Sequence, residues 1–395
     1  MVRRSEVFGI SIVAVVCLLL IVFSQKDLNN YQRSHRYQQY IELDDSFKYS
    51  NTNNTYSTRS IDDVISIQRS LLSKELSRYE FPEDTNLDDY TLSTGGKPIR
   101  TIIITTWRSG STFLGDILNA VPGNYYHYEP LLDYGIVQIR GPPDARPALE
   151  TLKSLLNCDY SNLYNYLNFG LSHVFLFTHN TRLWDQCEIY PTYCWNATFL
   201  NKFCKLFPFQ SMKSVRLRLA LAEKLLEDED LNVKVILLVR DPRGTMQSRK
   251  HRDWCPGMPD CDQPYNLCRD LVSDYKAAGP LLQLYPDRFR VLRYEDLSLD
   301  PNEIARDLFD FLGLHFHRNV EKFLATHTRF NIGGVSSTFR DSKSTPFHWK
   351  SDLNYTEVQN IEENCEEAMR LWGYNRAKNV SDMKEFNPLT AYRVL

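Results

Sequence analysis

The sequence predicts an α/β fold, a P-loop-like parallel sheet flanked by helices, as a single domain behind an N-terminal membrane anchor and a stem. The sheet is predicted by two apolar runs, residues 101–106 and 233–239, each of which ends in a polar turn and leads into a helical pattern. Strands that alternate with helices are typical of a parallel sheet covered on both faces. The anchor and stem are predicted by an apolar N-terminal segment that a long polar stretch follows.

The N-terminal segment has the composition of a membrane span. Residues 7–23 are almost wholly apolar, and Arg3 and Arg4 precede them. Since positive residues flanking a span stay on the cytoplasmic side, we expect a cytoplasmic tail at 1–6, a transmembrane signal-anchor at 7–23 and a luminal remainder. A cleaved signal peptide is the alternative interpretation.

The polar stretch and the overall composition describe the remainder. Residues 24–97 are rich in Asn, Ser, Gln, Asp and Tyr, which predicts a luminal stem, with one amphipathic helix at 61–76. Residues 98–395 then form the domain, and a chain of 395 residues that is 43% hydrophobic can bury one large core. The formal net charge of −3 gives no general affinity for nucleic acid, so any anion binding must come from local arginines.

Cysteine usage agrees with a luminal location. Cys17 lies in the predicted span, and the eight other cysteines are an even number, which favours disulfides in an oxidising compartment. We expect local bridges within two clusters, at 187–204 and 255–268. No Cys-x-x-Cys pair occurs, so a zinc site is not expected. Four acceptor sequons fit luminal glycosylation; they begin at Asn53, Asn196, Asn354 and Asn379.

The turn after the first strand predicts an anion site. Residues 105–113 read Thr-Thr-Trp-Arg-Ser-Gly-Ser-Thr-Phe and open a helix at 111–119. Small and hydroxyl residues there direct backbone N–H groups, and the positive end of the helix dipole, at one point. The guanidinium of Arg108 adds a cation, so the turn predicts a phosphate or sulfate cradle, although it is not a Walker A loop. The predicted cradle residues are Trp107, Arg108, Ser109, Gly110, Ser111, Thr112 and Phe113.

The turn after the second strand predicts another anion site. Asp241 stands where a helix N-cap would be, and Pro242 suits the first helical turn. Arg240 and Ser248 could converge on one anion. Two anion sites at strand ends fit a nucleotide that carries phosphates at both ends. The predicted residues of this second loop are Arg240, Asp241, Pro242, Arg243, Gly244, Thr245, Met246, Gln247 and Ser248.

The remaining elements follow from periodicity. A helical, loop-rich region is expected at 148–207. Residues 214–219 form either a strand or the start of the helix at 219–226, which the pattern leaves open. Further along we expect helices at 268–284, 302–312 and 356–372, a strand at 289–294, and Gly373 as a helix C-cap.

These motifs resemble those of a known family, the Golgi carbohydrate sulfotransferases that sulfate the 6-hydroxyl of galactose, N-acetylglucosamine or N-acetylgalactosamine. The segment at 105–113 matches that family's 5′-phosphosulfate loop, and Arg-Asp-Pro-Arg-Gly…Ser-Arg at 240–249 matches its 3′-phosphate loop. Further matches are Tyr128-Glu129-Pro130-Leu131, Arg293-Tyr294-Glu295-Asp296-Leu297 and Phe347-His348-Trp349-Lys350, so that the resemblance covers 98–376.

The resemblance implies an activity and a location. The chain would transfer a sulfuryl group from 3′-phosphoadenosine 5′-phosphosulfate (PAPS) to a sugar 6-hydroxyl, N-acetylglucosamine or galactose being favoured, without a metal. Its acceptor would be a glycan on a glycoprotein or proteoglycan, and its place a single-pass type II position in the Golgi membrane. A homodimer is compatible with it.

The resemblance and the chemistry together assign roles at the donor site. Arg108 would hold the 5′-phosphate and stabilise the charge on the leaving group, while Arg240 and Ser248 would hold the 3′-phosphate. Either Trp107 or Trp349 would stack on adenine, with a place in the core as the alternative for both. Lys350 lies in a region that closes over the nucleotide in the family.

An acceptor hydroxyl needs a base, and Glu129 is the candidate. Aromatic neighbours would raise its pKa, and Pro130 would hold the backbone before it extended. A structural pairing with an arginine such as Arg108 is the alternative role for Glu129, and His127 is the alternative base. The family usually has a histidine four residues after this glutamate, where this chain has Asp133.

Three basic residues have weaker assignments. Lys213 and Arg216 would contact an acidic acceptor or, more commonly for such residues, form a solvated surface. Arg293 is expected to order the fold through an ion pair.

Two other functions remain open at the level of sequence. A type II glycosyltransferase would share the anchor, the disulfides and the sequons, and Asp228-Glu229-Asp230 offers it a nominal metal-binding motif. A non-catalytic luminal protein that binds a nucleotide or glycan is the other.

Overall fold

The computed structural model describes residues 59–333 and 337–395. The predicted cytoplasmic tail, membrane anchor and first part of the stem therefore lie outside the described residues, as does the sequon at Asn53. Over the two described stretches, none of the helices combines the length and the apolar character that crossing a membrane requires.

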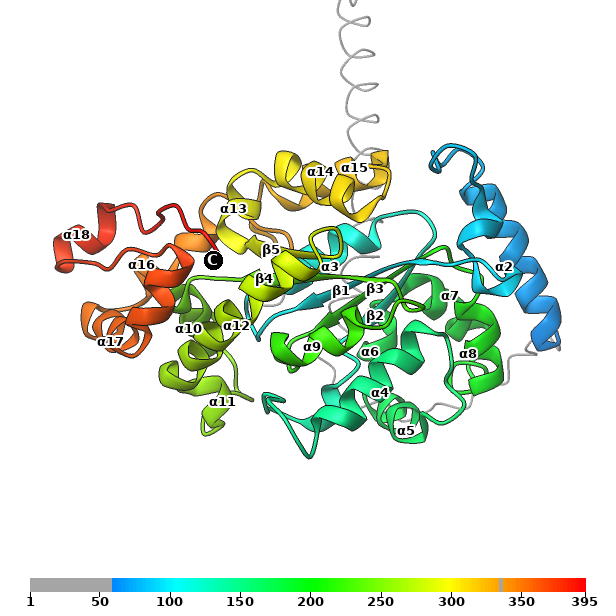
Figure 1. Cartoon of the computed structure of the whole chain (residues 1–395), viewed down its shortest axis with the longest axis horizontal. Coiled ribbons are helices and arrows are strands. Elements are labelled where there is room, and N and C mark those ends of the chain that lie inside the picture. The colour runs from blue at the N-terminus through cyan, green and yellow to red at the C-terminus, as the bar shows by residue number, and fades with distance from the viewer. Residues whose placement is uncertain (1–58, 334–336) are drawn as a thin grey trace, which may run out of the picture. The chain divides into compact units, whose positions relative to one another are not determined.

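A five-stranded parallel sheet forms the centre of the domain, with the strand order β2-β3-β1-β4-β5. In Figure 1 the sheet crosses the middle of the domain, with α13–α15 above it and α4–α6 and α9 below it. This arrangement confirms the predicted α/β class. The strands are β1 (Ile99–Ile104), β2 (Asn124–Tyr128), β3 (Phe209–Ser214), β4 (Val233–Val239) and β5 (Phe289–Arg293).

Two of these strands, β2 and β3, were not predicted, and the sequence of β3 is largely polar. β3 reads Phe-Gln-Ser-Met-Lys-Ser, yet all six residues are buried. Its polar side chains find partners inside the fold; for example, Asn124 Nδ2 of β2 donates to Ser211 Oγ at 2.8 Å. Buried polar groups that are hydrogen-bonded in this way give a strand without the apolar pattern on which sequence reasoning depends.

The strand register brings three strand ends to one edge. Ile104, the last residue of β1, pairs with Ser214 of β3 and Leu237 of β4. The connections that follow these strands, 105–110, 215–218 and 240–241, therefore leave the sheet close together. In open α/β sheets this carboxyl edge is where ligands bind.

Helices make up most of the rest of the described chain. They are α2 (Ile61–Glu75), α3 (Ser111–Asn119), α4 (Ala145–Leu156), α5 (Tyr164–Ser172), α6 (Phe175–Thr178), α7 (Thr181–Ile189), α8 (Ala197–Cys204), α9 (Leu219–Leu226), α10 (Pro242–Lys250), α11 (Pro259–Asp262), α12 (Pro264–Leu284), α13 (Tyr294–Leu299), α14 (Pro301–Leu312), α15 (Arg318–His327), α16 (Trp349–Asp352), α17 (Tyr355–Trp372) and α18 (Val380–Glu385). The helix C-cap at Gly373 has the expected left-handed conformation. Residues 215–218, left open by the sequence, connect β3 to α9.

The folded unit begins before residue 98. Helix α2 starts with a capping box between Ser60 and Asp63, and it buries Val64, Ile65 and Leu72 in the same core as the sheet. The segment that follows α2 is also fixed, since the backbone N–H of His315 donates to the hydroxyl of Tyr79. The last part of the predicted stem, from residue 59 on, is therefore packed structure, because the apolar side of the amphipathic helix finds a surface to cover.

The disulfides partly follow the predicted clusters. Cys187–Cys194 and Cys255–Cys261 are local bridges, as expected. A cluster of three cysteines can hold only one bridge, so the third member of each pairs with a cysteine that the fold brings close from elsewhere in the chain. Cys204 is bonded to Cys158, and Cys268 is bonded to Cys365, since α12 and α17 pack side by side.

Candidate active site

The loop after β1 is a tight turn that opens a helix, as predicted. Arg108 and Gly110 both have positive φ angles, 67° and 89°, which reverse the chain so that α3 begins at Ser111. A Cβ atom on Gly110 would lie 2.2 Å from the ring of Tyr294, so only glycine fits there. The hydroxyl of Ser109 is turned inward, 2.7 Å from Thr105 Oγ1. The first-turn N–H groups of α3 and the Arg108 side chain are thus set at the edge of the sheet.

The loop after β4 is built on a helix cap. The carboxylate of Asp241 accepts from the backbone N–H of Arg243 at 2.9 Å, as an N-cap does, and Pro242 is the first residue of α10. The backbone N–H of Asp241 in turn donates to Glu295 Oε1 at 3.0 Å. This cap fixes the direction of α10 and hence the position of Ser248 two turns later.

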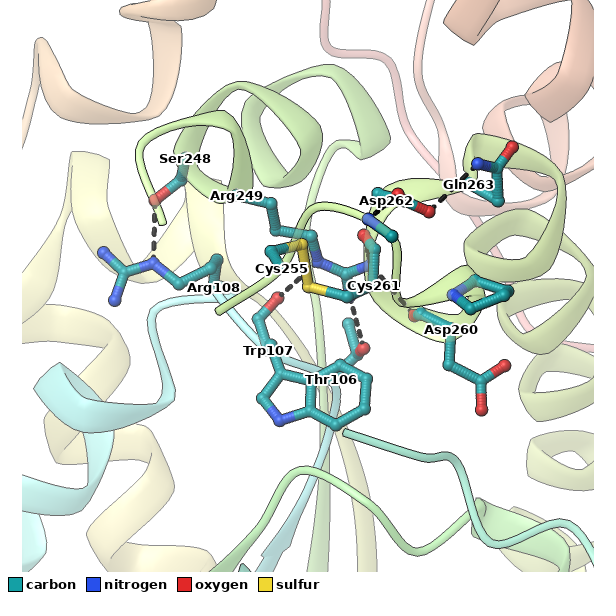
Figure 2. Close-up of a disulfide and its surroundings, with 12 residues drawn as sticks. Thr106, Trp107, Arg108, Ser248, Arg249, Cys255, Asp260, Cys261, Asp262 and Gln263 are labelled. Carbon is teal, nitrogen blue, oxygen red and sulfur yellow. Dashed lines mark hydrogen bonds between the residues drawn. A yellow bond between two sulfur atoms is a disulfide. The ribbon is translucent and has the colours of Figure 1, made fainter. Parts of the chain in front are cut away.

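The structure brings the two loops together at three predicted residues. Arg108 Nε donates to Ser248 Oγ at 2.9 Å, a contact drawn in Figure 2. Arg240 donates from its guanidinium to the carbonyl oxygen of Arg108 at 2.8 Å. The side chains that were assigned to opposite ends of one nucleotide therefore lie in a single continuous site.

Positive charge accumulates at this junction. Burial lowers the pKa of Arg108 to about 9, and the nearby positive charges of Arg252, Arg240 and Arg340 act in the same direction. Burial also lowers the pKa values of Arg252 and Arg340. Like charges held together in a poorly hydrated place repel one another, and an anion bound between them relieves that repulsion, so the cluster suits an anionic ligand.

Arg240 also suits an anionic ligand. Its Nε is buried and has no hydrogen-bond partner within the described residues. Its guanidinium lies 4.6 Å from the ring of Tyr294, and the absence of a side chain on Gly244 leaves it room along α10. A buried N–H of a charged group without a partner is rare, because it carries the full cost of desolvation. A phosphate at this place would satisfy it.

Sequence reasoning missed Arg252 and Arg340. Arg252 lies just beyond the end of α10, two residues after its last helical residue Lys250, so helical spacing from Ser248 does not mark it. Arg340 lies in a region with no regular pattern, close to residues that the structure does not describe, and no signal in the sequence marks it.

Other members of the predicted second loop have structural partners. Arg243 is fully buried, pairs with Asp241 and with Glu362 of α17 at 2.7 Å each, and stacks on the ring of Trp349. Pro242, Gly244 and Thr245 are buried in α10, and Gln247 donates to Asp352 at 2.6 Å. Met246 packs partly buried against the core. The side chains of this loop that reach Arg108 are those of Arg240 and Ser248.

Lys350 and the two candidate tryptophans also belong to the framework. Lys350 Nζ donates to the carbonyl oxygen of Phe386 and lies over its ring. Trp349 is fully buried and Trp107 is 4% exposed, so both rings sit in the core, the alternative to stacking on adenine. The guanidinium groups of Arg216 and Arg249 lie 5.5 and 5.6 Å from the centre of the Trp107 ring.

Arg249 braces the first loop from behind. It donates to the carbonyl oxygen of Trp107 at 3.2 Å, to Thr106 Oγ1 at 2.6 Å and to the carbonyl oxygen of Cys261 at 2.8 Å. Figure 2 shows this side chain between the loop and the Cys255–Cys261 bridge. One arginine of α10 thus connects the turn that carries Arg108 to the disulfide-closed segment after α10.

Glu129 differs from its prediction. Its carboxylate accepts from Lys213 Nζ and from the guanidinium of Arg216, each at 2.9 Å. Burial alone would raise the pKa of Glu129, but the charges of Lys213 and Arg216 outweigh it and lower the pKa to about 2. The expectation of a raised pKa is therefore wrong, whereas the alternative, a carboxylate that pairs with an arginine, is observed, with Arg216 in place of Arg108. The φ angle of 43° also shows that the backbone is left-handed, not extended, before Pro130. The assignment of Glu129 as the base stays a prediction.

The neighbours of Glu129 are likewise buried. Lys213 and Arg216 are each about 1% exposed, so neither forms a solvated surface. His127, the alternative base, is buried beside Tyr125 and does not reach solvent. Burial lowers its pKa to about 3, so the imidazole stays neutral near neutral pH. Arg293 forms the expected ion pair, with Asp296 at 2.7 Å.

A second carboxylate, Asp116, was missed. It lies on α3, one turn after Thr112, and it is partly exposed. Burial raises its pKa to about 7, against the opposing charge of Lys213. Lys213 Nζ also lies 3.3 Å from Thr112 Oγ1 and 3.8 Å from the centre of the Tyr128 ring. Two carboxylates whose pKa values shift in opposite directions therefore both experience the charge of Lys213, and such pairs are typical of sites that move protons. Helical spacing from Thr112 was the available signal.

The first residue of the nominal metal-binding motif, Asp228-Glu229-Asp230, has other partners. Asp228 pairs with Lys153 at 2.8 Å and accepts from the backbone N–H of Leu231, in the turn after α9. Across 59–333 and 337–395, His, Cys, Asp and Glu side chains do not gather into a group of three or more that could hold a metal ion.

Comparison with known proteins agrees with this geometry. Residues 98–373 match the family described as the sulfotransferase domain. Carbohydrate sulfotransferase 4 of Mus musculus is 27% identical over 324 residues, covering 72% of this chain and 84% of the relative. Carbohydrate sulfotransferase 1 is 28% identical over 332 residues in Mus musculus, covering 72% and 81%, and 26% identical over 332 residues in Homo sapiens, with the same coverage.

Among solved structures, mouse sulfotransferase SULT7A1 complexed with PAP matches with a TM-score of 0.37 and 10% identity, over 77% of this chain and 90% of that one. The sequence match extends from the start of β1 to the end of α17 and so includes both anion-binding loops and their common edge of the sheet. The chain belongs to the sulfotransferase domain family.

Proposed function

We propose that this protein transfers a sulfuryl group from PAPS to the 6-hydroxyl of a hexose or N-acetylhexosamine in a glycan and releases 3′-phosphoadenosine 5′-phosphate (PAP). N-acetylglucosamine and galactose are the favoured sugars. The observation that carries the proposal is the single cationic site in which Arg108, Arg240 and Ser248 meet. The curated relatives named as carbohydrate sulfotransferases support the choice of acceptor.

The donor would lie along the two loops. The first-turn N–H groups of α3 and the Arg108 side chain suit the 5′-phosphosulfate, where they would stabilise the charge that builds on the departing phosphate. Arg240, with its buried Nε, and Ser248 suit the 3′-phosphate. Because guanidinium groups and backbone dipoles supply the positive charge, the proposal includes no metal.

The acceptor would approach from the side of Lys213. Glu129 contacts this lysine and Asp116 experiences its charge, and either carboxylate would remove the proton from the sugar hydroxyl. Asp116 suits the role of base better than Glu129. A base whose pKa lies near the working pH is ionised in a large fraction of the molecules and still has a high affinity for a proton.

The proposal extends to location. Four disulfides fit an oxidising compartment, and the apolar segment at 7–23 fits a single-pass type II anchor in the Golgi membrane. The sequons at Asn196, Asn354 and Asn379 are exposed helix N-caps, and each cap uses the side-chain oxygen, which leaves the amide nitrogen for a glycan.

The test is transfer of labelled sulfate from PAPS by the full chain to galactose, N-acetylglucosamine and N-acetylgalactosamine acceptors, with EDTA present. We expect label on one class of sugar, at the 6-position, and loss of transfer in Arg108→Ala. A folded protein that binds PAP but labels no sugar would refute the acceptor class. A folded protein that does not bind PAP would refute the donor site as well.

A further inference from the structure

The segment after α10 presents an exposed tryptophan. All six tryptophans of the chain lie within the described residues. Trp254 is 37% exposed, whereas the other five are buried or only partly exposed. An exposed indole is costly in water, so a tryptophan kept at the surface beside a functional site indicates a ligand with an apolar face.

Trp254 lies beside the proposed acceptor side of the site. Its ring packs edge-on against the ring of Trp107, with centroids 6.5 Å apart and planes at 62°. In Figure 2 the Trp107 ring points away from the contact between Arg108 and Ser248. The same ring lies 5.5 Å from the guanidinium of Arg216, which holds Glu129. Trp254 is therefore connected through the Trp107 ring to Arg216 and so to Glu129.

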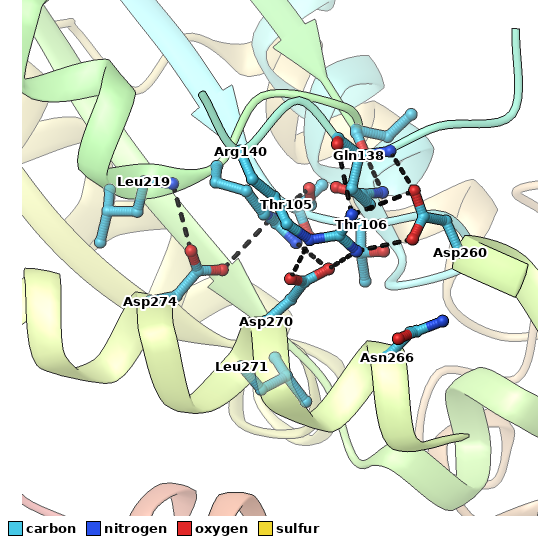
Figure 3. Close-up of polar contacts among 12 residues, drawn as sticks. Thr105, Thr106, Gln138, Arg140, Leu219, Asp260, Asn266, Asp270, Leu271 and Asp274 are labelled. Carbon is cyan, nitrogen blue, oxygen red and sulfur yellow. Dashed lines mark hydrogen bonds and ion pairs between the residues drawn. The ribbon is translucent and has the colours of Figure 1, made fainter. Parts of the chain in front are cut away.

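The segment that carries Trp254 is tied at several points. Cys255, the next residue, is bonded to Cys261, whose carbonyl oxygen accepts from Arg249. The carboxylate of Asp260 accepts from the backbone N–H of Gln138 at 2.7 Å and from Arg140 at 2.6 Å, contacts that Figure 3 shows together. A rigid indole loses little conformational entropy when it binds, so this anchoring suits a recognition surface.

We infer that Trp254 is the platform on which a sugar ring of the acceptor glycan packs. The C–H face of a pyranose is apolar and flat, and it matches an indole face, while the sugar hydroxyls need polar partners at the edge. Asp253, also exposed, stands next to Trp254, and Arg252 lies near Tyr128 at the centre of the site. The inference rests on the proposed function, because it takes the acceptor to be a glycan.

The first test is steady-state kinetics of the full chain with Trp254→Ala and Trp254→Phe. We expect the alanine variant to raise the acceptor KM by about tenfold, equivalent to about 1.4 kcal/mol of binding free energy. The phenylalanine variant retains a flat ring and should recover most of the affinity. The KM for PAPS and the Kd for PAP should stay within about twofold of the wild type, a difference of only about 0.4 kcal/mol. Tyr265→Ala is the matched control, since it removes a ring that is 59% exposed on α12 and should leave all constants unchanged.

Two results would overturn the inference. One is an active Trp254→Ala enzyme with an unchanged acceptor KM. The other is a loss of PAP affinity as large as the loss of acceptor affinity, which would assign the ring to adenine. Equal melting temperatures of the variants and the wild type show that the fold is kept.

A second readout separates this inference from the proposed function. Saturation-transfer NMR with the three monosaccharide acceptors and PAP detects sugar binding without turnover. If the wild type transfers no sulfate but binds a sugar, and Trp254→Ala loses that signal, the platform stands and the reaction is wrong. If the wild type binds none of the sugars, the platform is wrong.

Discussion

At the scale of single residues, the site is defined by ionisable groups whose pKa values differ from their ordinary ones. Glu129 and Asp116 both experience the charge of Lys213, yet the pKa of Glu129 falls to about 2 and that of Asp116 rises to about 7. Glu129 has two cations within hydrogen-bonding distance, whereas burial dominates at Asp116. Glu129 is thus held as an anion that orders Lys213 and Arg216, and Asp116 can exchange a proton near neutral pH.

This contrast predicts the pH dependence of the reaction. If Asp116 removes the acceptor proton, kcat/KM should rise with pH through about 7, because the carboxylate must be ionised to act. Asp116→Asn should remove this limb and lower kcat by about 100-fold or more. Stopped assays between about pH 5 and about 9 measure this pH dependence in the wild type and in Asp116→Asn, and PAP binding serves as the control for folding. A limb that survives in Asp116→Asn and disappears in Glu129→Gln would give the role to Glu129.

Glu129→Gln should act on stability instead. The folded-state pKa of about 2 lies below the ordinary value of 4.5, so the contribution of Glu129 to stability is present above pH 4.5 and is lost as the pH falls towards 2. Replacing the carboxylate leaves two buried cations without their anion, which costs about 3–5 kcal/mol near neutral pH. In urea unfolding, the free energy of unfolding of Glu129→Gln should lie far below that of the wild type at about pH 7. The difference should be smaller at about pH 3. A constant difference would show that the charge of Glu129 is not what stabilises the fold.

At the scale of elements, the turn after β1 carries the most stringent local requirement. Gly110 combines a φ of 89° with a Cβ position that the ring of Tyr294 already occupies. Gly95 has a similar φ of 86° and nothing within 4 Å of its Cβ position, so it is a matched control. Both alanine variants should lose about 1–2 kcal/mol from the left-handed backbone.

Only Gly110→Ala should also displace the loop, and we expect its Kd for PAP to rise by at least about tenfold, or about 1.4 kcal/mol. Calorimetric titration with PAP compares the two variants. Equal affinities in Gly95→Ala and Gly110→Ala would mean that the loop can move to accept the side chain without loss of the anion site.

Some elements of this fold could be predicted from the sequence and others could not. The turn after β1 and the cap at Asp241 were predictable, because their residue types serve a local geometry that depends on near neighbours alone. β3 was not, since Gln210, Ser211 and Lys213 are buried by partners far along the chain. The expectation of a raised pKa for Glu129 was wrong for the same reason. The charges that lower this pKa come from β3 and from the connection after it. Long-range pairing of polar groups leaves no periodic trace in one sequence.

At the scale of the whole molecule, the folded unit takes in part of what the composition assigns to the stem. Leu71 and Leu72 of α2 give a direct test, since Leu71 is 53% exposed and Leu72 only 2%. Leu72→Ala should cost about 2–5 kcal/mol of unfolding free energy, because it opens a cavity in the core. Leu71→Ala should stay within about 0.5 kcal/mol of the wild type. Urea unfolding of both variants measures this, and equal effects would show that α2 is not docked in solution.

The long-range disulfide connects stability to the donor site. Cys268–Cys365 joins α12 to α17 across 97 residues of sequence, and α17 also supplies Glu362, which holds Arg243 against the cap of α10. In the chain-entropy model, removing this bridge by a double Cys→Ala change should cost about 4–5 kcal/mol, while removing Cys255–Cys261 should cost only about 2 kcal/mol.

The two bridges should also differ in function. Loss of Cys268–Cys365 frees the helix that positions Arg243, so PAP affinity should fall together with the melting temperature. Loss of Cys255–Cys261 loosens the segment that carries Trp254, so the acceptor KM should rise. Because Arg249 joins this segment to the turn that carries Arg108, PAP affinity should fall as well, but by less than in the other variant. Melting curves with and without PAP, beside acceptor kinetics, separate the two effects. If both variants lose PAP and acceptor affinity in parallel, the two sides of the site are one cooperative unit, and the division between a donor side braced by α17 and an acceptor side braced by the 255–261 bridge is wrong.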